Sequence, residues 1–403
     1  MSNVVQLKHL EHIEDEMLNY GVDGCWAAVR FMQELCKMLG KEGSSGYMQT
    51  KWDGAPSVVC GVDPASGMFF VGNKSVFNKD NPKLCFSDRD IDIYYADKPG
   101  LAEKLSMSLK YFSRLGIKGV IQGDLMFTEG DKKHEVVDGE SLITFRANTI
   151  TYGIPKKDPI GVEVDAAKIG VVFHTHYDGT TLAGAQARAG ADVDNFSKIA
   201  ECAVIKNDTP MHDISMDGTE IKKFDNNVQV IKQMCQKAGK FLDYLVDHMG
   251  TTGDKKYHVA SYLKQFFNAE IRQGRSISDP KSALKKIGEF YKDKMDKEVS
   301  KMKSPPKVVE RRNQLYSGLK YLEDNEQEFH AMFALYKKIQ ENKQIVIDAL
   351  DKLETFRTYV QTDNGYRVTT PEGYVLHHDG DMIKLVNRIE FSFINFTLDK
   401  SWK

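Results

Sequence analysis

Apolar residues recur along the chain with two different spacings, and the changes between them divide it into segments. Near the N-terminus, Leu7, Leu10 and Ile13 lie three residues apart and Leu18 follows, and a second run with spacings of three and four extends from Val29 to Leu39. This is the spacing of one face of an α-helix. Residues 1–46 are therefore predicted to form two helices, the second ending near Gly40.

From about residue 47 to residue 178 the apolar runs become short and are separated by turns. The runs "PSVVCGV" and "GMFFVG" flank "DPASG", which is typical of a β-hairpin. One helical run, "LAEKLSMSLKYFSRLG", follows, and further strands are predicted at "GVIQGDLMF", "SLITFRANTITYG" and "AKIGVVFHTHY". Strands and a helix alternate irregularly here, which indicates an α+β arrangement.

Residues 226–361 return to helical spacing. Apolar residues from Val228 to Met249 recur three or four positions apart, and Gly250 follows where a helix would be capped. Asp279-Pro280 begins a second long helix, and a third follows Pro305-Pro306. At about residue 364 the β pattern returns with "GYRVTTPEGYVLHHDGDMIKLVNR".

These patterns predict an α+β fold whose sheet domain is interrupted by helices. The expected divisions are a helical N-terminal segment at 1–46, a sheet domain at 47–179 plus 364–403, and an all-helical insertion at 180–363. The last strands of the sheet domain are then encoded after the insertion.

Composition limits the class of protein further. The 403 residues are 41% hydrophobic and 28% charged, without an apolar run long enough to span a membrane and without a signal peptide. The six cysteines are scattered without a C-x-x-C pair, which favours a reduced, cytoplasmic protein without structural zinc. Because the formal net charge is only −2, a polyanionic partner would have to bind a local basic patch.

The sequence "KWDGAP", which begins at Lys51, raises the question of whether this lysine is a nucleophile or a surface charge beside an Asp-Gly turn. A lysine amine attacks phosphorus only when it is neutral, so we expect burial or neighbouring cations to lower the Lys51 pKa. A nucleotide would also require a carboxylate for its ribose, an aromatic side chain for its base, and further charged groups for its metal and phosphates.

Residues of these types follow in order along the chain. Asp124 lies in the apolar run "IQGDLMF", and a carboxylate there requires polar partners. Phe173 lies in "GVVFHTHY" and is suited to stacking on a base. Glu372 precedes a glycine at a predicted strand start, and Lys384 follows in "MIKLV".

This ordered set resembles the covalent nucleotidyltransferase superfamily of ATP-dependent DNA and RNA ligases and mRNA capping enzymes. "KWDG" is similar to motif I of that superfamily, "GNKS" with Lys74 to motif Ia, "GDLMF" to motif III, "VVFHTHY" to motif IIIa, "EGYV" to motif IV and "IKLV" to motif V. The form of "EGYV" and the small residue after KxDG are closest to bacteriophage RNA ligases. The resemblance covers roughly residues 47–178 and 364–403.

The resemblance implies an antiparallel-sheet adenylyltransferase core and a site for each group. Lys51, Asp53, Glu372 and Lys384 would serve catalysis, with Asp53 orienting Lys51 or the waters of the metal. The ATP-binding residues would be Gln49, Thr50, Lys51, Trp52, Gly54, Ser57, Lys74, Asp124, Phe173, Glu372 and Lys384. Gln49 and Thr50 would read the adenine edge, and Glu372 and Asp124 would bind Mg²⁺ or Mn²⁺.

The chain departs from the superfamily pattern in three ways. Pro56 stands where DNA ligases carry arginine, which argues against a standard DNA ligase. Lys384 is followed by Leu385 and Val386, so the second motif V lysine is missing, and Arg388 is a candidate replacement. The distance along the chain from Phe173 to Glu372 is unusually long, which the helical insertion explains.

The sequence thus predicts an ATP-dependent polynucleotide ligase that joins a 5′-phosphate to a 3′-hydroxyl, with RNA favoured over DNA. The alternatives are nucleotide transfer to another acceptor, as in capping or protein AMP transfer, and a ligase-fold nucleic-acid-binding protein without turnover. We expect a monomer without a membrane partner, acting in the bacterial host cytoplasm if the protein comes from a phage.

A basic stretch in the insertion is the candidate surface for RNA or DNA ends. Residues 285–312 hold ten Lys or Arg against five Asp or Glu, and Lys292, Lys301 and Arg311 are its chosen representatives. A run of charges of this kind also fits an ordinary solvated helix face, so both interpretations stand at this point.

Overall fold

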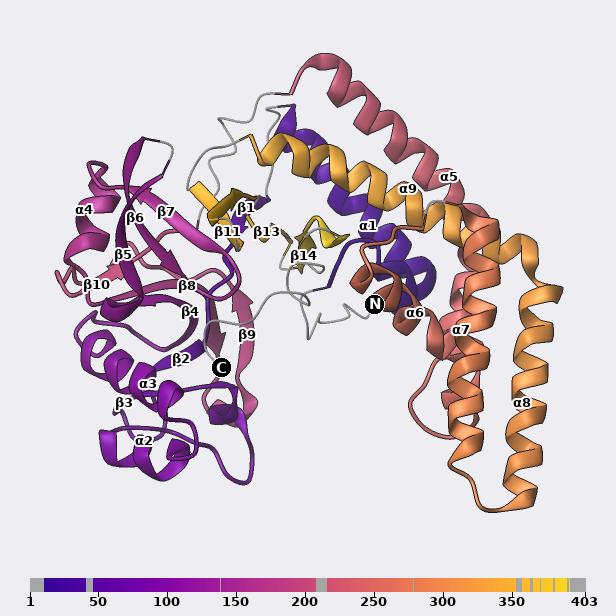
Figure 1. The fold of residues 1–403 in the computed structure, drawn as a ribbon, viewed down its shortest axis with the longest axis horizontal. Coiled ribbons are helices and arrows are strands. Elements are labelled where there is room, and N and C mark those ends of the chain that lie inside the picture. The colour runs from indigo at the N-terminus through magenta and orange to yellow at the C-terminus, as the bar shows by residue number, and fades with distance from the viewer. Residues whose placement is uncertain are drawn as a thin grey trace. The chain divides into compact units, whose positions relative to one another are not determined.

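The computed structural model describes residues 11–40, 46–137, 139–207, 216–277, 279–352, 357–362, 365–369, 371–379, 381–389 and 391. The chain divides into two compact units. A sheet unit contains the described parts of 48–209 and 354–380, and a helical unit contains those of 1–47, 210–353 and 381–397 (Figure 1). Each unit is described by itself.

The sheet unit contains a sheet in the order β10-β8-β4-β2-β3, with β9 paired to β8. Its strands are β2 (Ser57–Val62), β3 (Phe69–Gly72), β4 (Val120–Thr128), β8 (Ile169–Asp178), β9 (Gln186–Ala189) and β10 (Cys202–Val204). The pairs β2–β3, β2–β4, β4–β8 and β8–β9 are antiparallel, whereas β8–β10 is parallel. The predicted "DPASG" turn joins β2 to β3, as its hairpin chemistry indicates.

Both faces of this sheet bury apolar side chains. One face packs with α3 (Pro99–Phe112) and α2 (Asp88–Tyr95) around a core that includes Val58, Ile121 and Phe173. The other face holds a smaller apolar cluster with Val59 and Val120. Because adjacent residues in a strand point to opposite faces, the second face also receives Gln122 and Asp124 from β4.

A second antiparallel sheet in the same unit has the order β12-β11-β7-β6-β5. Its strands are β5 (Lys132–Val137), β6 (Glu140–Arg146), β7 (Thr151–Pro155), β11 (Arg357–Thr362) and β12 (Gly365–Val368), and α4 (Pro159–Ala166) follows β7. Strands from before and after the helical region therefore pair within one sheet. A further pairing joins β1 (Tyr47–Lys51) to β13 (Gly373–His378).

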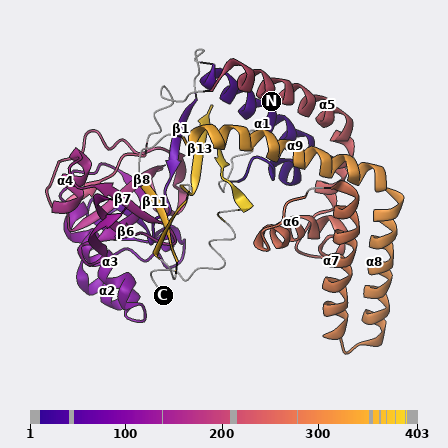
Figure 2. The ribbon, with the colours of Figure 1, turned by 45° about the horizontal axis from the view of Figure 1, so that its top comes forward.

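The helical unit contains α1 (Glu16–Leu39), α5 (Gly218–His248), α6 (Leu263–Arg272), α7 (Pro280–Ser300), α8 (Pro305–Asp324), α9 (Glu326–Leu350) and the short strand β14 (Asp381–Leu385). α1 lies along α5 (Figures 1 and 2). A kink at Tyr20 and Gly21 interrupts α1, and Gly21 has a φ of 59° that favours glycine. The Asp243 carboxylate accepts a hydrogen bond from the N–H of Val22 next to it, at 2.8 Å.

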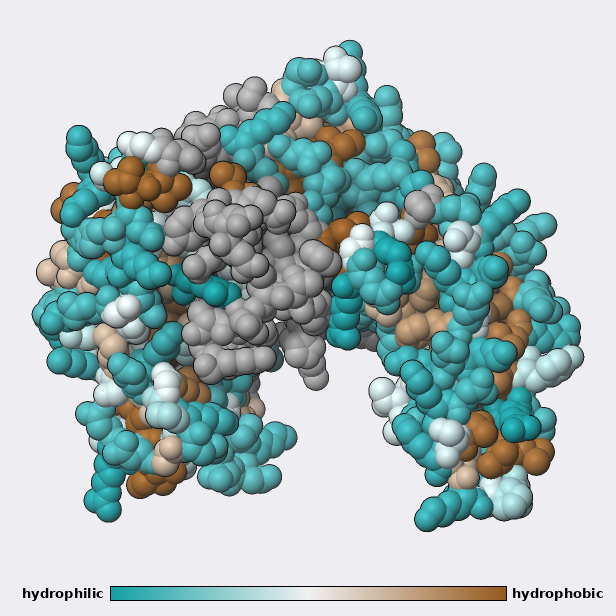
Figure 3. Space-filling model, in the orientation of Figure 1, coloured by the Kyte–Doolittle hydropathy of each residue, from teal (hydrophilic) through white to brown (hydrophobic). Residues whose placement is uncertain are grey.

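α7 and α8 form an antiparallel pair that projects from this unit (Figures 1 and 2). Asp279 caps α7 through a hydrogen bond from the Ser282 N–H, and prolines open both helices, as the sequence predicts. Figure 3 shows mainly hydrophilic side chains over this pair, interrupted by apolar patches.

The helical unit also buries three consecutive acidic residues. Glu14 forms an ion pair with Lys343 at 2.8 Å, and Asp15 forms one with Arg388 at 2.9 Å. Glu16 is 1% exposed, and its Oε1 atom has no hydrogen-bond partner within the described residues. Only two of the three buried carboxylates are thus compensated by a buried cation.

The predicted mixed α+β class with antiparallel sheets is confirmed. The division into units differs from the predicted one in four places. The N-terminal helix belongs to the helical unit, and so does the segment 381–397. The described parts of 180–209 and of 354–363 belong to the sheet unit, and β11 in the latter is a strand where helix was predicted. Leu7 and Leu10 lie outside the described residues, and in the described chain no helix is long and apolar enough to cross a membrane.

Candidate active site

Lys51 and Glu372 form an ion pair in the sheet unit. Lys51 ends β1 and Glu372 directly precedes β13, so the pairing of these two strands places the side chains together. Their side chains are 23% and 12% exposed, so the pair is partly shielded from solvent but remains accessible. The sequence-predicted partners therefore meet although they are far apart along the chain.

The charge state of Lys51 differs from the expectation. Burial alone would lower the Lys51 pKa, but the ion pair and hydrogen bond with Glu372, aided by Asp124 and Asp53, raise it above its ordinary value. The expected lowering of the pKa is therefore wrong for this state of the protein. The reason is that Glu372, Asp124 and Asp53 together stabilise the ammonium more than burial penalises it.

Asp124 contributes to the same electrostatic environment from β4. His174 on β8 approaches it, with 3.4 Å between His174 Nε2 and Asp124 Oδ2. Burial would raise the Asp124 pKa, but His174, the charge of Lys51 and a hydrogen bond from Ser57 together hold it below its ordinary value. Asp124 is thus an anion, as a ligand for ribose hydroxyls or a cation requires.

The Asp53 carboxylate is hydrogen-bonded to a different part of the sheet unit. Its carboxylate accepts hydrogen bonds from Asn148 Nδ2 at 2.8 Å, the Thr149 N–H at 2.7 Å, the Thr149 hydroxyl at 2.5 Å and the Ile150 N–H at 3.0 Å. These donors lie in the turn between β6 and β7. Asp53 was expected to orient Lys51 or the waters of the metal. Binding of metal waters does not fit a carboxylate that is saturated in this way and only 5% exposed, whereas an effect on Lys51 through the two-residue backbone between them is compatible with it.

Gly54 is required by packing against β4. A Cβ atom at this position would lie 2.7 Å from the Asp124 Cβ and 2.9 Å from the Leu125 carbonyl oxygen. The neighbouring Ala55 N–H donates to the same Leu125 oxygen at 2.9 Å. The glycine therefore permits close approach of protein backbone, whereas the sequence suggested close approach of a nucleotide.

The residues before Lys51 contact Asn207, which the sequence analysis did not identify. Gln49 Nε2 donates to Asn207 Oδ1 at 3.1 Å, and the Thr50 N–H donates to the Asn207 carbonyl oxygen at 2.7 Å. Trp52 is buried, with its ring 5.1 Å from that of Tyr152. These contacts fix β1, and the predicted reading of adenine by Gln49 and Thr50 is untested.

Ser57 belongs to a chain of polar groups on the Asp124 face of the sheet. Gln122 Nε2 donates to the Ser57 hydroxyl at 2.9 Å, and the Tyr177 hydroxyl donates to Gln122 Oε1 at 2.5 Å. The Tyr177 ring lies 4.4 Å from that of Phe77. His174, Gln122 and Tyr177 were missed because isolated polar residues in predicted strands give no signal of which face they occupy.

Phe173 does not lie on this face. It is 2% exposed and packs edge-to-face against Phe112 and Phe196, within the core on the α3 side of the sheet. The expectation that Phe173 stacks on a base is therefore wrong in this structure. Ile169, Val171 and Phe173 alternate along β8 into this same core, and the irregular register of β8 against β4 follows Phe173, between it and Thr175.

Lys74 and Lys384 stay predicted site residues without a demonstrated contact to Lys51. Lys74 is exposed at the start of η1 (Lys74–Phe77) in the sheet unit. Lys384 lies in β14 of the helical unit, where its N–H donates to the Glu11 carbonyl oxygen at 2.9 Å. Arg388, the candidate replacement for the missing motif V lysine, is instead buried against Asp15.

The three residues predicted to bind a polynucleotide, Lys292, Lys301 and Arg311, differ in their exposure. Lys292 and Lys301 are exposed on or next to α7, in agreement with a surface role. Arg311 is only 8% exposed, with its guanidinium over the ring of Tyr257. Its assignment to a polynucleotide-binding surface is therefore incorrect, because its charge is enclosed by the helices.

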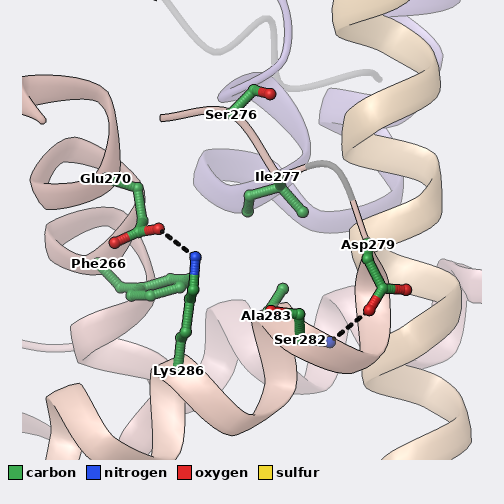
Figure 4. Close-up of a pocket in the computed structure, with 8 residues that line it drawn as sticks. All are labelled: Phe266, Glu270, Ser276, Ile277, Asp279, Ser282, Ala283 and Lys286. Carbon is green, nitrogen blue, oxygen red and sulfur yellow. Dashed lines mark hydrogen bonds and ion pairs between the residues drawn. The ribbon is translucent and has the colours of Figure 1, made fainter. Parts of the chain in front are cut away.

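The helical unit contains a small hollow between α6 and α7. Figure 4 shows Lys286 reaching Glu270 beside Phe266, and the two charged groups are 3.1 Å apart. Because Glu270 and Asp279 place two carboxylates in its lining against the one ammonium of Lys286, the hollow does not favour the phosphates of a nucleotide. Among the residues that the structure describes, no group of three or more His, Cys, Asp or Glu could hold a metal by itself.

The comparisons with known proteins identify a family but not an activity. Residues 3–400 match the model of DUF6267, a family of unknown function, so the chain belongs to that family. The chain matches no curated protein and no solved structure.

Proposed function

We propose that this DUF6267 family member is an ATP-dependent polynucleotide ligase, with RNA as the favoured acceptor, that acts through a covalent lysyl-AMP at Lys51. The observation that carries the proposal is the meeting of Lys51, Asp124 and Glu372 in one electrostatic cluster. These residues come from the three segments that resemble motifs I, III and IV of the nucleotidyltransferases. A ligase-like core is part of the proposal.

The first chemical step is attack by Lys51 Nζ on the α-phosphorus of ATP. The amine must first lose a proton, so its ion pair with Glu372 describes a resting state that binding of the substrate has to disturb. A P–N bond then forms, the bond from the α-phosphorus to the bridging oxygen breaks, and pyrophosphate leaves.

Two further steps complete joining. An oxygen of the polynucleotide 5′-phosphate attacks the adenylate phosphorus, the P–N bond breaks, and Lys51 regains a proton. The 3′-hydroxyl then loses its proton and attacks the activated 5′-phosphate, forming the phosphodiester and releasing AMP. Asp124 would bind the ribose hydroxyls, while Lys74 would contact phosphate oxygens.

The carboxylates near Lys51 fit a hard divalent cation. Glu372 and Asp124 would hold Mg²⁺ or Mn²⁺ together with water and phosphate oxygens, because two carboxylates without a full protein cage are typical of Mg²⁺ sites. The bound cation supplies neutralisation of negative charge on the phosphates. When Glu372 binds the cation, its negative charge would stabilise the Lys51 ammonium less, and Lys51 would lose its proton more easily.

The experiment is covalent labelling with α-labelled ATP in the presence of magnesium, followed by denaturation of the protein. We expect stable label on the wild type and none on Lys51→Ala or Lys51→Arg, since arginine keeps the charge but not the nucleophile. Undiminished labelling of Lys51→Ala would overturn the proposal.

Other outcomes separate the alternatives. Preferential labelling by GTP would indicate a capping-like enzyme, and labelling without strand joining would indicate another AMP acceptor. Binding of ATP without labelling would indicate a ligase-fold protein without turnover.

A further inference from the structure

The turn between β6 and β7 is tied to the segment that carries Lys51. Asp53 supplies both of its carboxylate oxygens to this turn: Oδ1 accepts from Asn148, and Oδ2 accepts from both donors of Thr149 and from the Ile150 N–H. The Asp53 N–H donates to the Tyr152 hydroxyl at 2.8 Å. Asp53 and Thr149 are 5% and 1% exposed, so water competes little for these bonds.

The same segment is fixed on its other side by β4. Gly54 packs against Asp124, and the Ala55 N–H is bonded to Leu125. The backbone that follows Lys51 is therefore held between the 147–150 turn and the strand that carries Asp124. A change in either anchor would alter where Lys51 lies relative to Asp124 and Glu372.

We call the hydrogen bonds between Asp53 and the 147–150 turn the clamp. The clamp also affects which carboxylate the Lys51 ammonium contacts. Asp53 contributes to the charge stabilisation of the Lys51 ammonium, although less than Glu372 does. If the turn no longer used the Asp53 carboxylate, this anion would be released two residues from Lys51 and would compete with Glu372 for the ammonium. Hydrogen bonds from the turn therefore keep the Asp53 carboxylate away from the Lys51 ammonium and hold the backbone next to Lys51 in place.

We propose that Asn148 and Thr149 are positioning residues for the covalent step, acting through Asp53 to hold Lys51 in line with its substrate. This inference rests on the proposed function. The turn need not touch ATP, so its loss should reduce the rate of attack more than the binding of ATP.

Thr149→Val tests this, because valine has nearly the same shape but removes the hydroxyl donor. We expect the rate constant of lysyl-AMP formation at saturating ATP to fall at least tenfold, with the Kd for ATP changed less than threefold and full labelling reached at long times. Thr149→Ser retains a hydroxyl and should restore the rate to within threefold of the wild type.

Thr144→Val is the matched control. The Thr144 hydroxyl also donates to a partly buried carboxylate, that of Glu135, at 2.5 Å in the second sheet, and Asp53 accepts its hydrogen bonds from other residues. A purely structural effect would lower the fraction of protein that becomes labelled, without slowing the remainder, in both valine variants. An unchanged rate constant in Thr149→Val, or equal slowing in Thr144→Val, would overturn the inference.

A second readout separates this inference from the proposed function. If wild-type protein is not labelled by ATP, the ligase proposal fails, but the reaction of Lys51 with an amine-selective acylating reagent can still be followed by peptide mass spectrometry. The clamp predicts that Thr149→Val changes the Lys51 acylation rate at least threefold while Thr144→Val does not. Equal rates in all three proteins would show that the turn does not position Lys51.

Discussion

Lys51 and Glu372 form an ion pair that raises the Lys51 pKa, although a nucleophilic lysine has to be neutral. The raised pKa means that the pair stabilises the fold at neutral pH and that this contribution disappears only as the pH rises through the Lys51 pKa, above the ordinary 10.5. Under the proposed function, replacing Glu372 should make the amine more available and adenylylation slower.

We expect Glu372→Gln to lower the Lys51 pKa, because the largest stabilising partner of the ammonium is removed, so that Lys51 is acylated faster at pH 8 than in the wild type. Adenylylation should nevertheless slow by roughly 10²–10³, because a charged group that stabilises the transition state typically contributes about 3–4 kcal/mol. Acylation and ATP labelling across a pH series measure the two effects. Glu129→Gln, which removes an exposed partner of Lys168, should change neither rate.

Among the three buried acidic residues Glu14, Asp15 and Glu16, replacement of Glu16 and replacement of Glu14 should have opposite effects on the stability of the fold. Burial raises the Glu16 pKa to about 7 from an ordinary 4.5, with Glu11 and Asp15 adding to the shift. The folded state therefore binds the Glu16 proton more tightly, and stability falls as the pH rises from about 4.5 to about 7. Glu16→Gln should remove this loss and raise the unfolding free energy by about 2–3 kcal/mol at pH 8.

Glu14→Gln should have the reverse effect. Burial would raise the Glu14 pKa, but Lys343 and Arg388 lower it below its ordinary value. Removing its charge leaves the Lys343 ammonium, which is 3% exposed, without its anion and should destabilise the fold by about 3–5 kcal/mol. Urea unfolding at pH 5 and pH 8 distinguishes the variants, and identical pH profiles for Glu16→Gln and the wild type would contradict the assignment.

Charge reversal at Lys292 and Lys301, on or next to α7, tests whether these exposed lysines bind a polynucleotide. Lys292→Glu with Lys301→Glu should weaken polynucleotide binding and reduce its salt dependence, because fewer counterions are released, while labelling of Lys51 stays nearly unchanged. The stability should change by less than about 0.5 kcal/mol, since both side chains are exposed.

Arg311→Glu is the contrasting variant. It buries an anion beside the Tyr257 ring and removes the Arg311 contact with Gln314, so it should destabilise the helical unit severely. If joining by the double lysine variant stays at the wild-type level across the salt series, the exposed lysines are only a solvated face.

Phe173 and Tyr177 allow a test of which face of the sheet meets the base. Phe173→Leu should lower stability by less than the roughly 3–5 kcal/mol of a Phe→Ala change and leave the Kd for ATP unchanged. Tyr177→Ala, on the face of Gln122 and Asp124, should weaken ATP binding by about 1–3 kcal/mol if its ring stacks on the base. Calorimetric titration with ATP checks both, and weaker binding by Phe173→Leu alone would reverse the assignment.

The sequence by itself determined the local elements of this protein. Helical spacing with an Asp279-Pro280 start predicts α7, the "DPASG" turn predicts the β2–β3 pairing, and the three motif-like segments supply Lys51, Asp124 and Glu372. These features depend on residues within a few positions of one another, where backbone preference and side-chain periodicity act directly.

The tertiary structure decided which groups are satisfied by which partners. The run before Phe173 is apolar at consecutive positions, so the sequence could not show which face of the strand α3 covers, and the packing of α3 makes the face of Ile169, Val171 and Phe173 part of the core. The raised pKa of Lys51, the capture of Asp53 by the 147–150 turn and the burial of Arg311 all arise from contacts between distant segments. Burial and ion pairing change a side chain's chemistry by more than its own identity does, and only the folded chain fixes both.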